Sequence, residues 1–155
     1  MGIREFAGTV VVLTTVACAG DPPREKTDHS GDASKDFVSS VVPLNTEVAR
    51  ESRVDLVHPG GPSGHNLTGI GVRVAEWDEA AVRETHRDLL GRVTIQDGAG
   101  LSDHATHVAG TIAGSGVGDP ATQGMAPAAR LFSYSWELDL VEIAAMGPFV
   151  SASSH

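Results

Sequence analysis

The stretch Ser102–Gly116, which reads S-D-H-A-T-H-V-A-G-T-I-A-G-S-G, constrains the fold more than any other part of the chain. Its larger apolar residues recur at helical spacing, and the alanines and glycines between them keep the helix thin. Ser102 or Asp103 is suited to cap this helix, which puts His104 in its first turn. Gly110 costs about 1 kcal/mol relative to alanine inside a helix. Because such a cost is accepted, we predict that other backbone comes close to this helix near a functional site. The positive end of the helix dipole lies at the first turn and should favour the neutral, proton-accepting form of His104.

Strand and helix patterns alternate along the chain. Strand formers in Gly69–Asp78 (G-I-G-V-R-V-A-E-W-D) precede the predicted helix, and Leu131–Trp136 and Glu137–Met146 read as a buried strand and a helix. This order predicts an α/β fold, a parallel sheet with helices on both faces. Sites in such sheets form beyond the carboxyl ends of the strands. Asp78, at the end of its strand, and His104 should therefore project toward the same edge, although Asp78 alone would be read as a helix cap.

The histidine stretch resembles a segment of the subtilisin-like serine proteases, the subtilases. The family pattern is H-G-T-H-V-A-G-T-I-A-G, and residues 104–114 read H-A-T-H-V-A-G-T-I-A-G, with Ala105 as the one departure. The resemblance implies that His104 is the general base, and it gives His107 no catalytic role.

The stretch that ends at Asp78 is similar to the subtilase segment G-x-G-V-x-V-A-V-I-D-T-G, which carries the catalytic aspartate. Glu76 and Trp77 replace apolar residues of that pattern, and Glu79-Ala80 replaces its Thr-Gly. Residues 124–131 (G-M-A-P-A-A-R-L) match a further family segment, the entry to the next strand. The resemblance implies a subtilisin-like fold and a serine-type endopeptidase with polypeptide substrates, in which Asp78 orients His104 and stabilises its imidazolium form.

The family's nucleophile segment, G-T-S-M-A-x-P, does not occur in this sequence, and no serine after His104 has that context. The only asparagines, Asn45 and Asn66, precede Asp78, so the asparagine of the family's oxyanion hole is also missing. We therefore expect a truncated chain that holds an incomplete catalytic domain and is inactive by itself.

The domain prediction has four parts. Residues 1–20 have the features of an export segment: a short positive start, an uncharged apolar run and small residues around the sole cysteine, Cys18. This arrangement resembles a bacterial lipoprotein cleavage site, so we expect a secreted or cell-envelope protein that a lipid on Cys18 could anchor to the membrane. A frayed strand with a buried cysteine is the alternative. Residues 21–36 are predicted to be a disordered linker, 37–65 a leader segment, and 66–155 the partial catalytic domain.

Charge and residue clusters limit the other functions. The net charge of −9 argues against a nucleic-acid partner, because phosphate binding needs a basic surface. A metal-binding module could use His104 and His107 with Asp97 or Asp103, but no H-E-x-x-H motif or Cys/His cluster supports it. We predict no cofactor, and calcium, common in the family, has no assignable ligands here. A catalytically dead interaction protein that keeps half of the subtilase fold is a further alternative.

Overall fold

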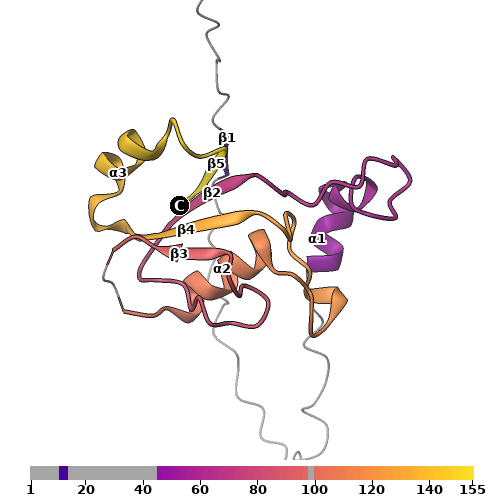
Figure 1. Cartoon of the computed structure of the whole chain (residues 1–155), viewed down its shortest axis with the longest axis horizontal. Helices are drawn as coiled ribbons and strands as arrows, with labels where there is room; N and C mark the ends of the chain where they lie inside the picture. The colour runs from indigo at the N-terminus through magenta and orange to yellow at the C-terminus, as the bar shows by residue number, and fades with distance from the viewer. Residues whose placement is uncertain (1–10, 14–44, 98–99) are drawn as a thin grey trace, which may run out of the picture.

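A five-stranded parallel sheet forms the centre of the part of the chain that the structure describes (Figure 1). This computed structural model describes residues 11–13, 45–97 and 100–155. The strand order is β1-β5-β2-β4-β3. The strands are β1 (Val11–Leu13), β2 (Arg73–Asp78), β3 (Val93–Ile95), β4 (Arg130–Ser135) and β5 (Ala152–Ser154). The helices are α1 (Asn45–Glu51), α2 (Asp103–Ala113) and α3 (Asp139–Met146), with 3₁₀ turns η1 (Val54–Leu56), η2 (Pro120–Thr122) and η3 (Trp136–Leu138).

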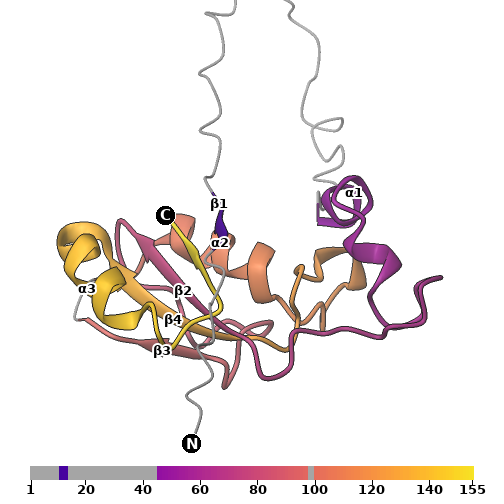
Figure 2. The same cartoon turned by 90° about the horizontal axis from the view of Figure 1, so that it is seen from above.

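Helices cover both faces of the sheet, as predicted (Figures 1 and 2). Successive side chains of a strand point to opposite faces, so β2 and β4 contribute to two separate cores. On one face Leu131 packs with the α2 alanines Ala105, Ala109 and Ala113. On the other face Trp77 and Tyr134 lie in a cluster that the partly buried Ile143 and Met146 of α3 complete. The fold class expected of a subtilase, an α/β sheet of which this chain holds a part, is thus confirmed.

Trp77 connects β2 to its neighbours on the α3 face. Its ring stacks on Tyr134 with centroids 4.7 Å apart, and on His155 at 5.0 Å. Its Nε1–H donates to Glu142 Oε2 at 3.0 Å, so the indole is satisfied although its side chain is buried. These contacts fix the side chain next to Asp78 firmly on the face opposite to α2.

Close backbone approach to α2 occurs at the end of the helix and not at Gly110, where we predicted it. A Cβ at Gly110 would meet nothing within 4 Å outside its own helix. Instead, the chain at Gly124 passes so close that a Cβ there would lie 2.6 Å from Gly114 N. The Met125 and Ala126 N–H groups also donate to carbonyls of the last turn of α2. This contact satisfies carbonyls that a helix end otherwise leaves unpaired.

Two strands were not predicted. They are β3, a strand of three residues, and β5, which lies close to the C-terminal end of the described residues. β5 contains only alanine and serine, which carry no strand signal, and its pairing with β2 determines its conformation.

The predicted export segment lies mostly outside the described residues, including Cys18. Its residues 11–13 form β1 and pair in parallel with β5. None of the helices in the described ranges is long and apolar enough to cross a membrane. The predicted linker, residues 21–36, also lies outside the described residues.

The core on the α2 face predicts a large effect of one truncation. Leu131 is 1% exposed, so Leu131→Ala should lower the free energy of unfolding by about 2–5 kcal/mol, because it leaves a cavity under α2. Urea unfolding followed by circular dichroism measures the change. The control is Leu140→Ala, because Leu140 is 79% exposed and should cost less than about 0.5 kcal/mol. Equal effects of the two substitutions would contradict the assignment of this core.

Candidate active site

Asp78 and His104 meet at the carboxyl end of the sheet. His104 Nδ1 lies 2.8 Å from Asp78 Oδ2 and 3.0 Å from Oδ1. An ionised carboxylate only accepts hydrogen bonds, so Nδ1 carries the ring proton and Nε2 has a free lone pair. The Asp78 side chain is 9% exposed and that of His104 66%, so the proton-accepting side of the pair faces outward.

The turn after Asp78 is hydrogen-bonded to the chain before α2, which brings the two residues together. Ala81 N–H donates to Gly100 O at 2.7 Å, and Ser102 N–H donates to Ala81 O at 2.9 Å. Ser102 Oγ–H also donates to Glu79 Oε1 at 2.7 Å. Glu79, which departs from the family pattern, therefore contributes to this connection. Ala80, where the family has glycine, is not among the described residues with positive φ, so this turn does not require a glycine.

Ser102 caps α2, as one of our two alternatives predicted. Its Oγ accepts a hydrogen bond from Ala105 N–H at 3.1 Å. His104 therefore lies in the first turn of the helix. Within the turn, Glu79 N–H donates to Asp78 Oδ1 at 2.7 Å and holds the carboxylate in place.

We expected the helix dipole to favour the neutral form of His104, but the pKa of the ring is shifted in the opposite direction. The hydrogen bond to Asp78, the negative charge of Asp78 and, to a smaller extent, Glu79 raise the pKa of His104 above its ordinary value. A charge-assisted bond at 2.8 Å outweighs the partial positive charge of a helix end that acts on an exposed ring. His104 is therefore easier to protonate than a free histidine, a property that stabilises an imidazolium intermediate.

Glu76 is a second carboxyl group on the same face of β2, two residues before Asp78. It is 1% exposed, and neither of its oxygens has a hydrogen-bond partner among the described residues. Burial, and secondarily the charge of Asp78, raise the pKa of Glu76 to about 9. From the sequence we identified Glu76 only as a departure from the family pattern. Its position, a charged residue in the middle of a strand of apolar residues, could have indicated a buried carboxyl group.

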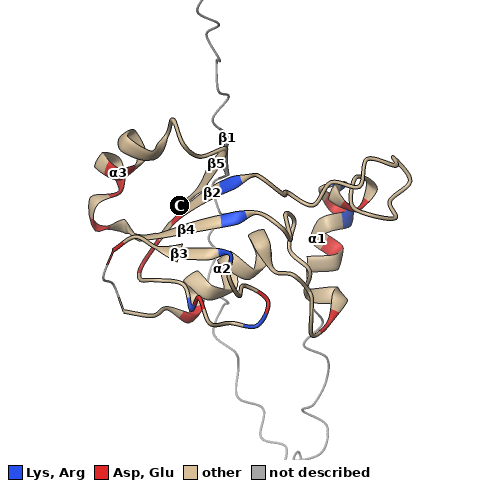
Figure 3. Ribbon diagram, in the orientation of Figure 1, with Lys and Arg blue, Asp and Glu red and all other residues tan. Residues whose placement is uncertain are grey.

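The electrostatic character of the sheet changes from one end to the other. Figure 3 shows basic residues at the starts of β2 and β4, where Arg73 and Arg130 are register partners. Acidic residues follow the strand ends, and one of them, Asp97, accepts from Ser135 N–H at 2.9 Å and from Ser135 Oγ–H at 2.8 Å. Of the acidic residues at this end, Asp78 and Glu79 are the ones that raise the pKa of His104.

The alternative of a metal-binding module finds no support in the described residues. They contain no group of three or more histidine, cysteine, aspartate or glutamate side chains arranged to hold a metal ion. Asp103 instead forms an exposed ion pair, in which its Oδ1 lies 3.5 Å from Nη2 of Arg83.

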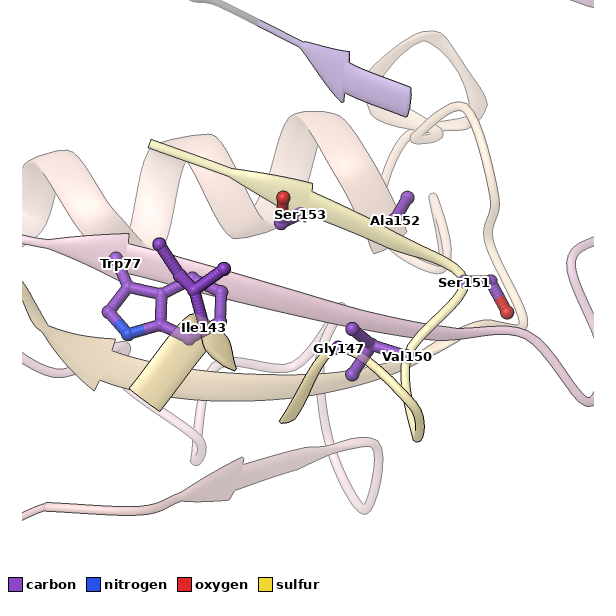
Figure 4. A pocket seen from close by; sticks show the side chains of 7 residues that line it. All are labelled: Trp77, Ile143, Gly147, Val150, Ser151, Ala152 and Ser153. Atoms are coloured by element: carbon purple, nitrogen blue, oxygen red, sulfur yellow. The ribbon is translucent and has the colours of Figure 1, made fainter. Parts of the chain in front are cut away.

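A small apolar cavity lies on the α3 face of the sheet. Trp77, Ile143 and Val150 line it, together with Gly147 and residues 151–153 (Figure 4). Because Trp77 and Asp78 are consecutive on β2, the cavity opens on the face opposite to the Asp78–His104 pair. It is therefore not part of this site.

Comparison with protein families identifies the segment that contains this pair. The model of the subtilase family matches residues 76–141. The match begins at Glu76, includes Asp78 and His104, and covers less than half of the chain. Comparisons with curated proteins and with solved structures found no match. Subtilases are serine endopeptidases, which act on polypeptides.

The pair predicts a change in histidine titration. Asp78→Asn should lower the pKa of His104 toward the ordinary value of 6.5, because the main causes of its rise are the hydrogen bond and the charge of Asp78. Proton NMR of the histidine ring signals as a function of pH measures the change. The matched control is Asp103→Asn, which removes an exposed carboxylate from the same helical turn and should shift the pKa of His104 less. Equal shifts in both variants would mean that long-range charge, and not this hydrogen bond, controls His104.

Proposed function

We propose that this chain supplies the aspartate and histidine of a subtilisin-like serine endopeptidase. The observation that carries the proposal is the bond of 2.8 Å between His104 Nδ1 and Asp78 Oδ2 within a segment that matches the subtilase family. In this function His104 Nε2 accepts the proton of a serine hydroxyl as it attacks the peptide carbonyl. His104 then protonates the amine that leaves.

Asp78 has two tasks in this mechanism. It holds the His104 tautomer that leaves Nε2 unprotonated, and it stabilises the imidazolium that forms when the serine loses its proton. The raised pKa of His104 supports the second task, because it reflects the preference of the site for the protonated ring. The 66% exposure of the His104 side chain supports access of another group to Nε2.

The serine and the oxyanion asparagine are the parts that this sequence lacks. None of its serines has the context of the family's nucleophile segment, and Asn45 and Asn66 both precede Asp78. The proposal is therefore that the 155-residue chain by itself does not hydrolyse peptides. The alternative is a catalytically dead interaction protein. Such a protein would stay inactive even when a segment that carries the serine is supplied.

Activity measurements separate the two proposals. The 155-residue chain should not be labelled by a fluorophosphonate probe and should not cleave casein. A chimera that joins it to the serine- and asparagine-bearing remainder of a subtilase domain should do both. In the chimera His104→Ala or Asp78→Asn should lower kcat/KM by roughly 10⁴-fold, because the serine then has no correctly oriented base.

The matched control for the chimera is His107→Ala, which removes the second histidine of the same motif. His107 has no catalytic role in the family, so this variant should keep the activity of the parent chimera. Casein cleavage by the 155-residue chain that His104→Ala abolishes would refute the proposed lack of a nucleophile. A chimera that folds but neither binds the probe nor cleaves casein would favour the interaction protein.

We further propose that the protein is exported and lipid-anchored through Cys18. The apolar run and the small residues around this cysteine support the proposal. In a bacterial host the wild-type protein should be found in the membrane fraction, and Cys18→Ala should release it from that fraction, because the lipid attachment atom is lost. Fractionation followed by mass spectrometry of the N-terminus measures both. Cytosolic protein with an intact Met1 would contradict the proposal.

A further inference from the structure

Glu76 lies inside the sheet beneath α2, next to the Asp78–His104 pair. Residues two apart on a strand point to the same face, so Glu76 and Asp78 share one face of β2. Glu76 is also the register partner of Ser133 on β4 and of Ser154 on β5. Ser133 lies two residues after Leu131, which packs against α2, so the α2 face is the one that Glu76 occupies.

The uncharged surroundings of Glu76 offer it no compensation for a negative charge. Its two register partners are serines, and the α2 residues buried against this face are alanines. No side chain or backbone group of the described residues donates a hydrogen bond to either of its oxygens. An isolated carboxylate in such a place is far costlier than the neutral acid.

The charged and titratable groups on this face are few, and they come from five places. They are Asp78 on β2, Glu79 in the following turn, His104 on α2, Asp97, which binds Ser135 of β4, and Asp88 with Arg92 near the end of α2. Among them Asp78 is the group whose charge raises the pKa of Glu76, and it therefore opposes ionisation. Arg92 is bound to the carbonyls of Asp88 and Ala113, at the other end of α2 from His104.

We propose that Glu76 is a positioning residue of the Asp78–His104 pair, which keeps its own carboxyl proton and so leaves Asp78 as the one negative charge that faces the ring from within the sheet. The proposal rests on the proposed function only in taking His104 as the base. Glu76 does not touch the substrate or the reacting atoms. It acts through Asp78, by keeping the interior beneath that carboxylate uncharged.

The neutral state of Glu76 has a limit in alkaline solution. When its proton is lost, a second negative charge appears beside Asp78. This charge favours the imidazolium form of His104, so the titration of the ring is coupled to that of Glu76. The pKa of Glu76 is raised to about 9, so this event takes place in alkaline solution.

NMR titration of the full chain tests the proposal. With ¹³C in the glutamate carboxyl groups, the Glu76 signal should keep the chemical shift of a protonated acid at pH 7 and should change near pH 9. The His104 ring signals should show a main midpoint and a second, alkaline inflection that coincides with the Glu76 change. Glu76→Gln should remove the second inflection and leave the main midpoint unchanged, because the glutamine is neutral like the protonated acid.

Glu84→Gln is the matched control, since it makes the same chemical change at an exposed residue and should leave both His104 transitions as they are. An ionised Glu76 signal at pH 7, a missing alkaline inflection, or a lower main midpoint in Glu76→Gln would overturn the proposal. A main midpoint that is not raised in the wild type would instead count against the Asp78–His104 pair, and so against the proposed function.

Stability provides a second measurement, which compares the wild type with Glu76→Gln. Burial raises the pKa of Glu76 in the folded state above its value of 4.5, so the folded chain holds a proton that the unfolded chain releases. The contribution of Glu76 to stability is present below about pH 4.5 and is lost as the pH rises toward about 9. The urea midpoint of the wild type should therefore fall over this range relative to that of Glu76→Gln. A difference between the two midpoints that does not change with pH would contradict a neutral, buried Glu76.

Discussion

Two backbone hydrogen bonds, from Ala81 to Gly100 and from Ser102 back to Ala81, determine where His104 lies relative to Asp78. They join the turn that leaves β2 to the residues that enter α2. Since Asp78 ends the strand and Ser102 caps the helix, the positions of both functional side chains follow from this short parallel bridge. The side-chain bond from Ser102 to Glu79 adds a third connection at the same place.

The alanines of α2 determine how the bridge and the sheet fit together. A helix with leucines on its buried face would lie farther from β2 and β4, because interaxial distances depend on the side chains at the contact. The buried residues of α2 are Ala105, Ala109 and Ala113, so the helix axis can approach the sheet closely. Its first turn thereby comes within hydrogen-bond reach of Asp78. The same small side chains share their face of the sheet with Glu76, a residue too large and too polar for a tightly packed leucine core.

Much of the central fold could be predicted from the sequence because the decisive elements carry strong local signals. The helical spacing after Ser102 and the strand formers before Asp78 led to α2 and β2, and their order led to the parallel sheet. β3 and β5 could not be predicted in this way, because three-residue strands owe their conformation to the neighbours with which they pair.

The candidate site was predicted in part. Asp78 and His104 were identified from their motifs, and the structure brings them together, whereas their catalytic roles are still predictions. The direction in which the pKa of His104 is shifted was inferred wrongly, because a sequence shows the helix end but not the length of the bond to Asp78. The burial of Glu76 likewise depends on β4, β5 and α2, which lie far from it along the chain.

Side chains alternate between the two faces of β2, so the contacts of Trp77 on the α3 face also determine where Glu76 and Asp78 lie on the α2 face. A slip of β2 by one residue would turn Trp77 toward α2 and would move Glu76 and Asp78 to the α3 face. The stack of Trp77 on Tyr134 and its bond to Glu142 are lost in such a slip, so they penalise the misaligned sheet. The contacts of the indole therefore favour the strand register in which Asp78 lies beside His104.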